Sequence, residues 1–327
     1  MRVVMPLFLV VGLALTAWVG WAIHLQGLFG VLVPYLAALI FVVGFCVKVV
    51  DWAKSAVPFK IPTTAGQQKS LPWIKHAKIE SPFTTGQVIL RMFFEVFFFR
   101  SLFRNVKGEL RSGPSLIYGP TKWLWLSAIM FHYGFLMVIL HHLRLATYPV
   151  PGPIALLDKI DAMFQIGAPP IYLSSLLLLI GVVALFLRRV LIPQVRYISL
   201  VNDYFPLFLI FGIVVSGMLM RYFVRTDIVA VKALVMGLVT FHPVVPEGIG
   251  AIFYIHLFLV CCLFAYFPFS KLMHMGGVFM SPTRNLPNNN RAVRHVNPWN
   301  PKVKLHTYEE WVEDYRDKLE EAGIPTD

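Results

Sequence analysis

The stretch FHYGFLMVILHHLR, residues 131–144, is an apolar run of helical character that contains three histidines, at positions 132, 141 and 142. An ionisable side chain within a membrane helix is expensive unless it is paired or binds a ligand. We therefore expect this segment to cross a membrane and to use its histidines for more than anchoring.

The whole chain shares this apolar character. Of its 327 residues, 57% are hydrophobic and 14% are charged, and the mean hydropathy is +0.67, which excludes an ordinary soluble domain. Runs of about 20 apolar residues are long enough to cross a hydrocarbon core of roughly 30 Å. The sequence contains six such runs: 6–25, 30–50, 123–146, 169–188, 203–223 and 249–269. No short apolar region with a cleavage site precedes them, so we expect the first to be a retained helix.

The net charge of +12 is better explained by membrane orientation than by nucleic acid binding. Basic residues concentrate between the second and third runs, after the fourth and after the sixth. These three segments lie on one side if six helices cross, and the positive-inside rule makes that side cytoplasmic. The prediction is a multi-pass protein of the cytoplasmic membrane, surrounded by lipid, with both termini in the cytoplasm.

Two apolar segments are not predicted to cross. In 82–105, Arg91 with Glu95 and Arg100 with Arg104 recur at helical spacing, and phenylalanines fill much of the remainder. This pattern predicts an amphipathic helix on the cytoplasmic membrane surface. The segment 228–241 is too short to span and is expected on the outer surface.

Two further helices are predicted outside the spans. Residues 147–164 form a proline-broken outer loop that leads into a short helix. In the polar tail, Thr307 and Glu310 match a capping box, which predicts a soluble C-terminal helix.

The spacing of the histidines on the third and sixth runs can be tested against helical geometry. Each α-helical residue turns by about 100°, so His132 and His142 lie about 80° apart, whereas His141 lies about 180° from His132. His256 and His274 are 18 residues apart, about five turns, and share a face if their helix is continuous.

Two helices that each carry two histidines at different depths can clamp two flat cofactors. Haem b is the natural occupant, because its iron accepts a neutral imidazole on each face. The directions of the helices predict an outer pair, His142 with His256, and an inner pair, His132 with His274. Pro268 is expected to break or kink the last helix and to bring His274 closer to His132. The alternative is that these histidines only form hydrogen bonds between helices.

These spacings resemble the respiratory nitrate reductase gamma-subunit family, which are membrane di-haem cytochromes b, across roughly residues 120–285. Two stretches resemble most closely the DsrM branch, the cytochrome b subunit of the membrane complex linked to dissimilatory sulfite reduction, DsrMKJOP. They are PFSKLMHMGGVFMSPTRNLPNNNR at 268–291 and LPWIKHAKIESPFTTGQVILRMFFEVFFFRSLFRNVK at 71–107. The family's pairing of haem ligands is the pairing expected above.

The resemblance implies an all-α integral membrane protein that exchanges electrons between menaquinone or menaquinol at the outer haem and a cytoplasmic partner at the inner haem. The implied partner is an iron–sulfur subunit related to heterodisulfide reductase and similar to DsrK. A multihaem cytochrome c, a periplasmic iron–sulfur protein and a second integral membrane subunit are also implied. The alternatives are the cytochrome b subunit of a related cytochrome c-linked or hydrogenase-type complex, and, in another class, a haem-free permease or structural membrane anchor.

Further site residues follow from this interpretation. Quinol oxidation releases protons near the outer haem, and His141 is the adjacent candidate acceptor, with Asp158 and Asp161 as weaker candidates for proton exit. Haem propionates need cationic partners. The candidates are Arg144 and Arg221 for the outer haem, and Lys122 and Lys271 for the inner haem. Each cation is alternatively a residue that extends to the membrane interface.

These features divide the chain into four predicted parts. They are a two-helix membrane segment over 1–52, a basic cytoplasmic segment with an amphipathic interface helix over 53–121, a di-haem cytochrome b core over 122–274 and a cytoplasmic tail over 275–327.

Overall fold

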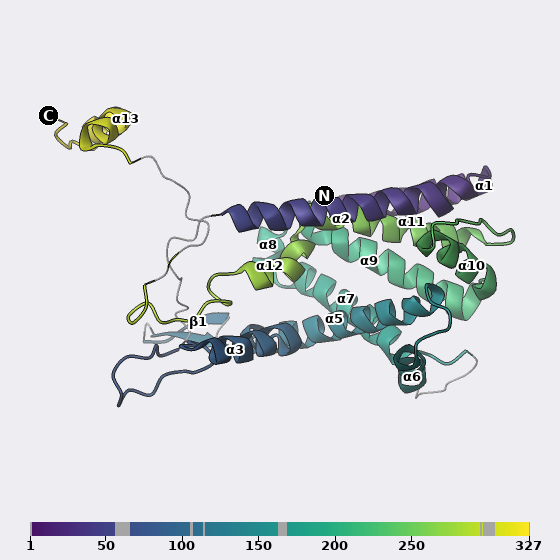
Figure 1. The fold of residues 1–327 in the computed structure, drawn as a ribbon, viewed down its shortest axis with the longest axis horizontal. Helices are drawn as coiled ribbons and strands as arrows, with labels where there is room; N and C mark the ends of the chain where they lie inside the picture. The colour runs from purple at the N-terminus through teal and green to yellow at the C-terminus, as the bar shows by residue number, and fades with distance from the viewer. Residues whose placement is uncertain are drawn as a thin grey trace.

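The architecture is a bundle of long helices, drawn in Figure 1. The computed structural model describes residues 2–55, 66–104, 107–113, 115–162, 169–294, 296 and 305–326. Parts of the basic segment and the tail, 56–65 and 297–304, therefore lie outside the described residues. Within the described ranges, six helices are long and apolar enough to cross a membrane. They are Val4–Ala22, Leu28–Lys54, Lys122–Leu145, Leu173–Leu191, Val201–Val224 and Ala251–Phe269. The six predicted runs are confirmed as long apolar helices.

Most spans combine an α-helix with a turn of another type. The α-helices are α1 (Val4–Ala22), α2 (Val33–Lys54), α5 (Lys122–His142), α7 (Leu173–Leu191), α9 (Val201–Leu219) and α11 (Ala251–Tyr266). A π-helical turn, Leu28–Leu32, precedes α2, and another, Met220–Val224, follows α9. Short 3₁₀ turns, Leu143–Leu145 and Phe267–Phe269, extend α5 and α11.

The remaining elements are short. The helices are α3 (Thr85–Phe98), α4 (Arg100–Phe103), α6 (Gly152–Asp161), α8 (Pro193–Ile198), α10 (Ile228–Val239), α12 (His274–Met280) and α13 (Tyr308–Glu321). Strands β1 (Lys107–Arg111) and β2 (Ser115–Gly119) form an antiparallel hairpin with Lys107 opposite Gly119. The sequence analysis did not predict this hairpin. The predicted capping box of α13 is confirmed, because the Thr307 hydroxyl accepts from the Glu310 N–H at 3.2 Å and the Glu310 carboxylate accepts from the Thr307 N–H at 3.1 Å.

The closest helix pair is α5 on α7. A Cβ atom added at Gly134 would lie 2.7 Å from the Leu178 backbone nitrogen, and one added at Gly181 would lie 2.6 Å from the Phe131 backbone nitrogen. Glycine at both positions therefore lets the two backbones touch, as small residues do between membrane helices. Helix α11 packs instead on α1, α2 and α9. In the part of the chain that the structure describes, α5 and α11 do not pack closely on each other.

The connecting segments collect at the two ends of this bundle. Figure 1 shows α3, β1, α8 and α12 toward one end and α6 and α10 at the other. This grouping matches the two sets of loops that the charge pattern separates. Helix α13 is drawn apart from the bundle (Figure 1).

Helix α3 is amphipathic, as predicted, but its charged strip does not face water. Arg91 and Glu95 are 7% and 8% exposed, whereas Ile89 and Phe93 are 65% and 46% exposed. Other segments of the chain cover the strip, and they supply the partners that buried charges need. The predicted single helix over 82–105 is also wrong, since Phe99 has a left-handed backbone (φ 48°) that separates α3 from α4.

The end of α3 lies alongside α5 rather than clear of it. The Tyr133 hydroxyl donates to the Phe97 carbonyl at 2.8 Å, and the Trp125 indole N–H donates to the Phe98 carbonyl at 2.7 Å. The ring of Phe99 meets the His132 imidazole edge-on at 5.0 Å between centroids. The segment after α3 is thus attached to the helix that carries the first two paired histidines.

Helix α11 ends at Tyr266, just before Pro268, so the predicted break is confirmed. Residues Phe267–Phe269 form a 3₁₀ turn, Ser270 is extended, and Lys271–Met273 form a second 3₁₀ turn before α12 begins at His274. The helix between His256 and His274 is therefore not continuous, so the two histidines do not share one helical face. Short turns bring His274 into place instead.

Candidate functional site

Two pairs of imidazoles lie between α5 and the end of the bundle sequence, with His256 in α11 and His274 at the start of α12. The rings of His142 and His256 are 6.2 Å apart between centroids and nearly parallel, at 10°. The rings of His132 and His274 are 5.9 Å apart and nearly perpendicular, at 85°. The structure therefore brings together the same partners that the sequence analysis paired.

Each of the four imidazoles is held by its Nδ1 atom. Its partner is a backbone carbonyl in every case: Ala128 at 2.8 Å for His132, Val138 at 2.6 Å for His142, Ile213 at 3.1 Å for His256 and Lys271 at 2.8 Å for His274. The Ser216 hydroxyl is a second neighbour of His256, at 3.0 Å from its Nδ1. A carbonyl accepts only from an N–H, so this contact places the proton on Nδ1 and leaves the Nε2 lone pair for a metal.

The separation of the rings fits an iron atom between them. Two metal–imidazole bonds of about 2.0–2.1 Å, with each centroid about 1 Å behind its nitrogen, place the centroids about 6 Å apart. His142 and His274 are exposed, and His132 and His256 are half-buried. Among the described residues, no group of three or more His, Cys, Asp or Glu is arranged so that it could hold a smaller metal ion. The residues therefore fit haem ligation on both faces.

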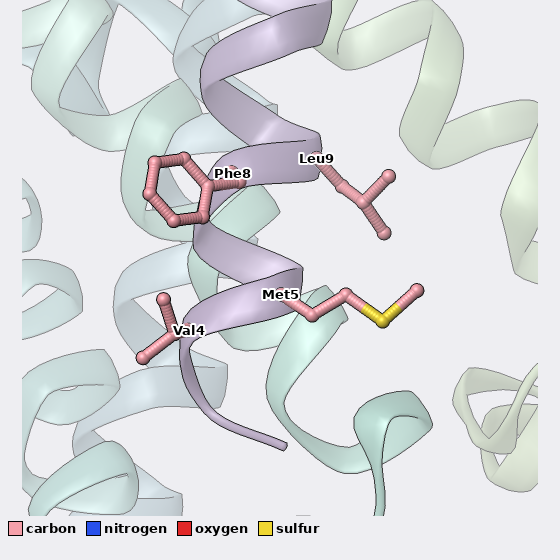
Figure 2. Close-up of a pocket in the computed structure, with 4 residues that line it drawn as sticks. All are labelled: Val4, Met5, Phe8 and Leu9. Carbon is pink, nitrogen blue, oxygen red and sulfur yellow. The ribbon is translucent and has the colours of Figure 1, made fainter. Parts of the chain in front are cut away.

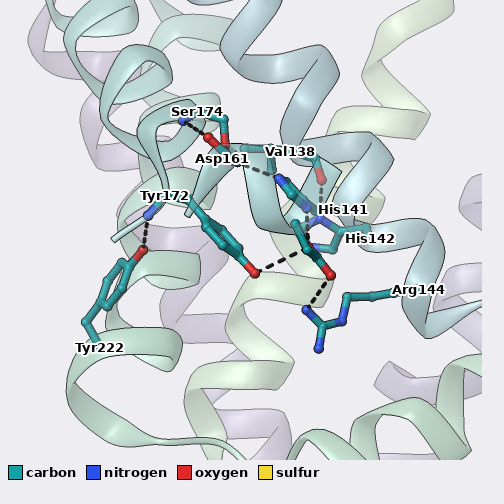
Figure 3. Close-up of polar contacts among 9 residues, drawn as sticks. Val138, His141, His142, Arg144, Asp161, Tyr172, Ser174 and Tyr222 are labelled. Atoms are coloured by element: carbon teal, nitrogen blue, oxygen red, sulfur yellow. Dashed lines mark hydrogen bonds and ion pairs between the residues drawn. The ribbon is translucent and has the colours of Figure 1, made fainter. Parts of the chain in front are cut away.

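His141 has different surroundings from its neighbour His142, as Figure 3 shows. Its Nδ1 lies 2.6 Å from an Asp158 carboxylate oxygen and its Nε2 lies 2.7 Å from an Asp161 carboxylate oxygen. Its ring stacks on Tyr172, at 4.6 Å between centroids and 6° between planes. The side chain therefore contacts α6 and the residue before α7, and both ring nitrogens are occupied.

A second layer of contacts fixes the two carboxylates. Asp161 accepts from the Ser174 N–H at 2.8 Å and the Ser174 hydroxyl at 2.5 Å, and its side chain is 4% exposed. Asp158 accepts from Arg144 and from the Tyr172 hydroxyl, both at 3.3 Å, and its side chain is 25% exposed. Asp158 is thus the more exposed of the two carboxylates in this cluster.

Tyr172 is held between cationic and acidic groups. The Arg221 guanidinium lies 3.8 Å from the ring centroid of Tyr172. The backbone N–H of Tyr172 donates to the Tyr222 hydroxyl at 3.1 Å. Burial raises the pKa of the Tyr172 phenol, although Arg221 opposes the shift. The phenol therefore keeps its proton at neutral pH and remains a donor to Asp158.

The four predicted propionate partners lie in different settings. Arg144 pairs with Asp158, and Arg221 covers Tyr172 while its buried Nε has no hydrogen-bond partner among the described residues. Lys122 is exposed at the start of α5. Lys271 donates to Asp203 at 2.7 Å.

Sequence reasoning missed Asp203, which is 7% exposed in the first turn of α9. Besides Lys271, its carboxylate accepts from the Leu200 N–H at 3.0 Å and lies 3.7 Å from Arg189. The sequence does indicate a role for Asp203, because an aspartate at the start of an apolar run is a cap or an ion-pair partner.

Sequence reasoning also missed an ion-pair network between the segment before α5 and the loop after α12. Glu80 accepts from Arg100 and, at 3.3 Å, from Arg104, while Glu95 accepts from Arg284 at 3.0 Å. Burial opposes ionisation of Glu80, but the hydrogen bond and charge of Arg100 outweigh it, so the pKa of Glu80 lies below its ordinary value. The Glu95–Arg284 pair attaches α3 to the residues that follow His274, and the Glu80 pairs hold the segment before α5 together.

The hollow in Figure 2 has no such chemistry. Its lining residues all come from α1 and are exposed: Val4, Met5, Phe8 and Leu9. It is a feature of the apolar outer surface of the bundle.

An all-α membrane bundle with two facing imidazole pairs is the arrangement of a membrane cytochrome b, which has an electron-transfer role. The chain belongs to the nitrate reductase gamma subunit family, whose profile matches residues 88–295. The predicted family resemblance is confirmed.

Three relatives place the chain within this family. It is 48% identical to the Hdr-like menaquinol oxidoreductase cytochrome b-like subunit of Archaeoglobus fulgidus, over 84% of each chain. It is 43% identical to the protein of the same name in Archaeoglobus profundus, over 83% of this chain and 82% of that one. It is 31% identical to the respiratory nitrate reductase 1 gamma chain of Escherichia coli, over 48% of this chain and 73% of that one.

Proposed function

We propose that the chain is a membrane di-haem cytochrome b subunit that passes electrons between the menaquinone pool and a cytoplasmic iron–sulfur partner, in dissimilatory sulfate or sulfite metabolism. The observation that carries the proposal is the pair of ring separations, 6.2 Å and 5.9 Å, with every Nδ1 held by a carbonyl. Haem b, when bound at each pair, supplies one-electron redox chemistry.

The residues of the chain would hold these groups at two depths. His142 and His256 would ligate the outer haem, and His132 and His274 the inner haem. Arg144 and Arg221 are the proposed propionate partners at the outer site, and Lys122 and Lys271 at the inner site. The unpartnered Nε of Arg221 supports its assignment, since a buried donor without an acceptor is costly.

Menaquinol is the proposed electron donor, and its oxidation releases two protons for every two electrons. His141 is the proposed catalytic proton acceptor, acting with Asp158 and Asp161. Its position next to His142 and the partial exposure of Asp158 support a route for protons to the outer surface. The two Archaeoglobus relatives, named as menaquinol oxidoreductase subunits, also support this donor.

The other end of the bundle is the proposed cytoplasmic face, with both termini on that side. The proposed partner there is the iron–sulfur subunit related to heterodisulfide reductase, and the Hdr-like name of the two relatives supports it. A hollow lined by residues 72 and 74–80, which include Lys75 and Lys78, offers a basic surface for docking. A multihaem cytochrome c, a periplasmic iron–sulfur protein and a second integral subunit are further proposed partners.

The test is His142→Ala in the purified complex, with haem counted by the pyridine haemochrome assay. We expect wild type to contain two haems per chain and the variant one, with loss of quinol oxidation. His242→Ala, at an exposed histidine outside the pairs, is the control and should retain both haems. A His142→Ala protein that still contains two haems would refute the ligand assignment.

A further inference from the structure

Helix α2 lies before the part of the chain that matches the family profile, yet it contacts the break between α11 and α12. A Cβ atom added at Gly44 would lie 2.8 Å from Cβ and 2.9 Å from Cγ of Pro268. Such close approaches are not tolerated, and the ring of Pro268 is rigid and buried. Glycine at position 44 therefore sets how closely α2 approaches the turn that leads to His274.

A second contact lies on the other side of the same histidine. Cβ atoms added at Gly276 and Gly277 would lie 3.4 Å from the Phe45 and Trp52 rings of α2, respectively. These are van der Waals distances, so the two glycines lie flat against the aromatic face of α2. The backbone on both sides of His274 is thus in contact with α2.

The inner ligand needs this support more than the outer one. His256 lies within the regular helix α11, which fixes its direction. His274 follows two 3₁₀ turns and an extended Ser270, so α11 does not determine its direction. Turns of this type have weaker hydrogen bonds than an α-helix. Helix α2 contacts the chain before and after His274 and so offers a surface that can hold this turn.

We propose that α2 positions the inner haem ligand, with Gly44 and Trp52 as positioning residues for His274. This proposal rests on the assignment of His132 and His274 as haem ligands, but not on the quinol donor or the cytoplasmic partner. It gives α2, which precedes the matched part of the chain, a defined part in cofactor binding.

The test compares Gly44→Ala with Gly12→Ala in the intact complex. Gly12 is a matched control, because no atom lies within 4 Å of a Cβ added there. We expect Gly44→Ala to change the midpoint potential and EPR signal of one haem only, the one that His274→Ala removes. Gly12→Ala should change neither haem.

Trp52→Ala is a second variant, which removes a ring and introduces no clash. It should alter the same haem. If the Gly44→Ala protein does not accumulate, Trp52→Ala alone tests whether α2 positions His274. Two normal haem signals in these variants, or an equal change of both haems, would overturn the positioning role and leave the proposed function intact. A wild-type protein without haem would instead overturn the proposed function.

Discussion

The contrast between His141 and His142 shows how neighbouring residues of one type acquire opposite roles. Nδ1 of His142 faces a carbonyl of its own helix, so its Nε2 lone pair is available. His141 places both nitrogens against carboxylates and stacks on Tyr172, so neither nitrogen is open to a metal. The one-residue step turns the side chain by about 100° toward α6. Position on the helix therefore leaves one histidine with a free Nε2, as the proposed haem ligation requires, and places the other in the acidic cluster.

The two imidazole pairs should differ spectroscopically. The planes are nearly parallel for His142 with His256 and nearly perpendicular for His132 with His274. The arrangement of axial ligands is one of the levers that set the electronic structure of haem iron. We predict two distinct low-spin ferric EPR signals in the purified protein, of which His256→Ala removes one and His274→Ala the other. A single uniform signal from two haems would contradict these ring orientations.

Asp161 should matter for proton transfer more than for haem content. Asp161→Asn keeps an oxygen for the Ser174 N–H but removes the negative charge beside His141. We predict a fall in quinol oxidation of about 10²- to 10⁴-fold, the usual contribution of general acid–base catalysis, with two haems retained. Asp227→Asn, at the N-cap of α10, is the control. Oxidation of a menaquinol analogue, normalised to haem content, measures the effect, and full activity would exclude the acidic cluster from the reaction.

At the scale of elements, the glycine contacts between α5 and α7 fix the position of α5, the helix that carries both His132 and His142. A Cβ added at Gly181 would meet backbone atoms of Phe131, at 2.6 Å from nitrogen and 2.8 Å from Cα, and backbone atoms cannot move aside as a side chain does. We predict that Gly181→Ala disturbs both haems and destabilises the detergent-solubilised protein by about 1–3 kcal/mol, the usual cost of overpacking. Gly152→Ala, with open space around it, should be neutral. Thermal unfolding and haem counts test this, and a change confined to one haem would be inconsistent with a shared contact.

The spans and the histidine pairs could be predicted because both depend on local spacing. Apolar length identifies a span, and the depth of a histidine along its helix identifies its partner across the bundle. The acidic cluster could be predicted only in part, because Asp158 and Asp161 reach His141 from a different element. Periodicity likewise located the charged strip of α3 but could not show that Glu80 and Arg284 would cover it. The polar contacts made by the connecting segments were the part that spacing did not reveal.

At the scale of the whole molecule, the ion-pair network at the proposed cytoplasmic end holds two distant segments together. Glu80 and Glu95 come from the basic segment before α5, and Arg284 comes from the loop after α12. One end of α3 contacts α5 near His132, and the loop with Arg284 follows His274. The network therefore connects segments that lie next to His132 and His274, the two histidines of the proposed inner pair.

The network should loosen only in acid. The pKa of Glu80 is lower in the folded protein than in the unfolded chain, so its contribution to stability is present above the unfolded value, about 4.3, and is lost as the pH falls through the folded value.

Glu80→Gln should remove this contribution at every pH, at a cost of about 1–3 kcal/mol for a hydrogen bond to a charged partner. Limited proteolysis of residues 66–104 in membrane vesicles that expose this face measures the effect. Wild type should resist cleavage at pH 7 and become sensitive only as the pH falls below the ordinary carboxyl range, whereas Glu80→Gln should be cleaved at pH 7. Glu109→Gln, in the exposed hairpin, should behave as wild type, and equal sensitivity of all three proteins at pH 7 would show that the network does not hold the segment.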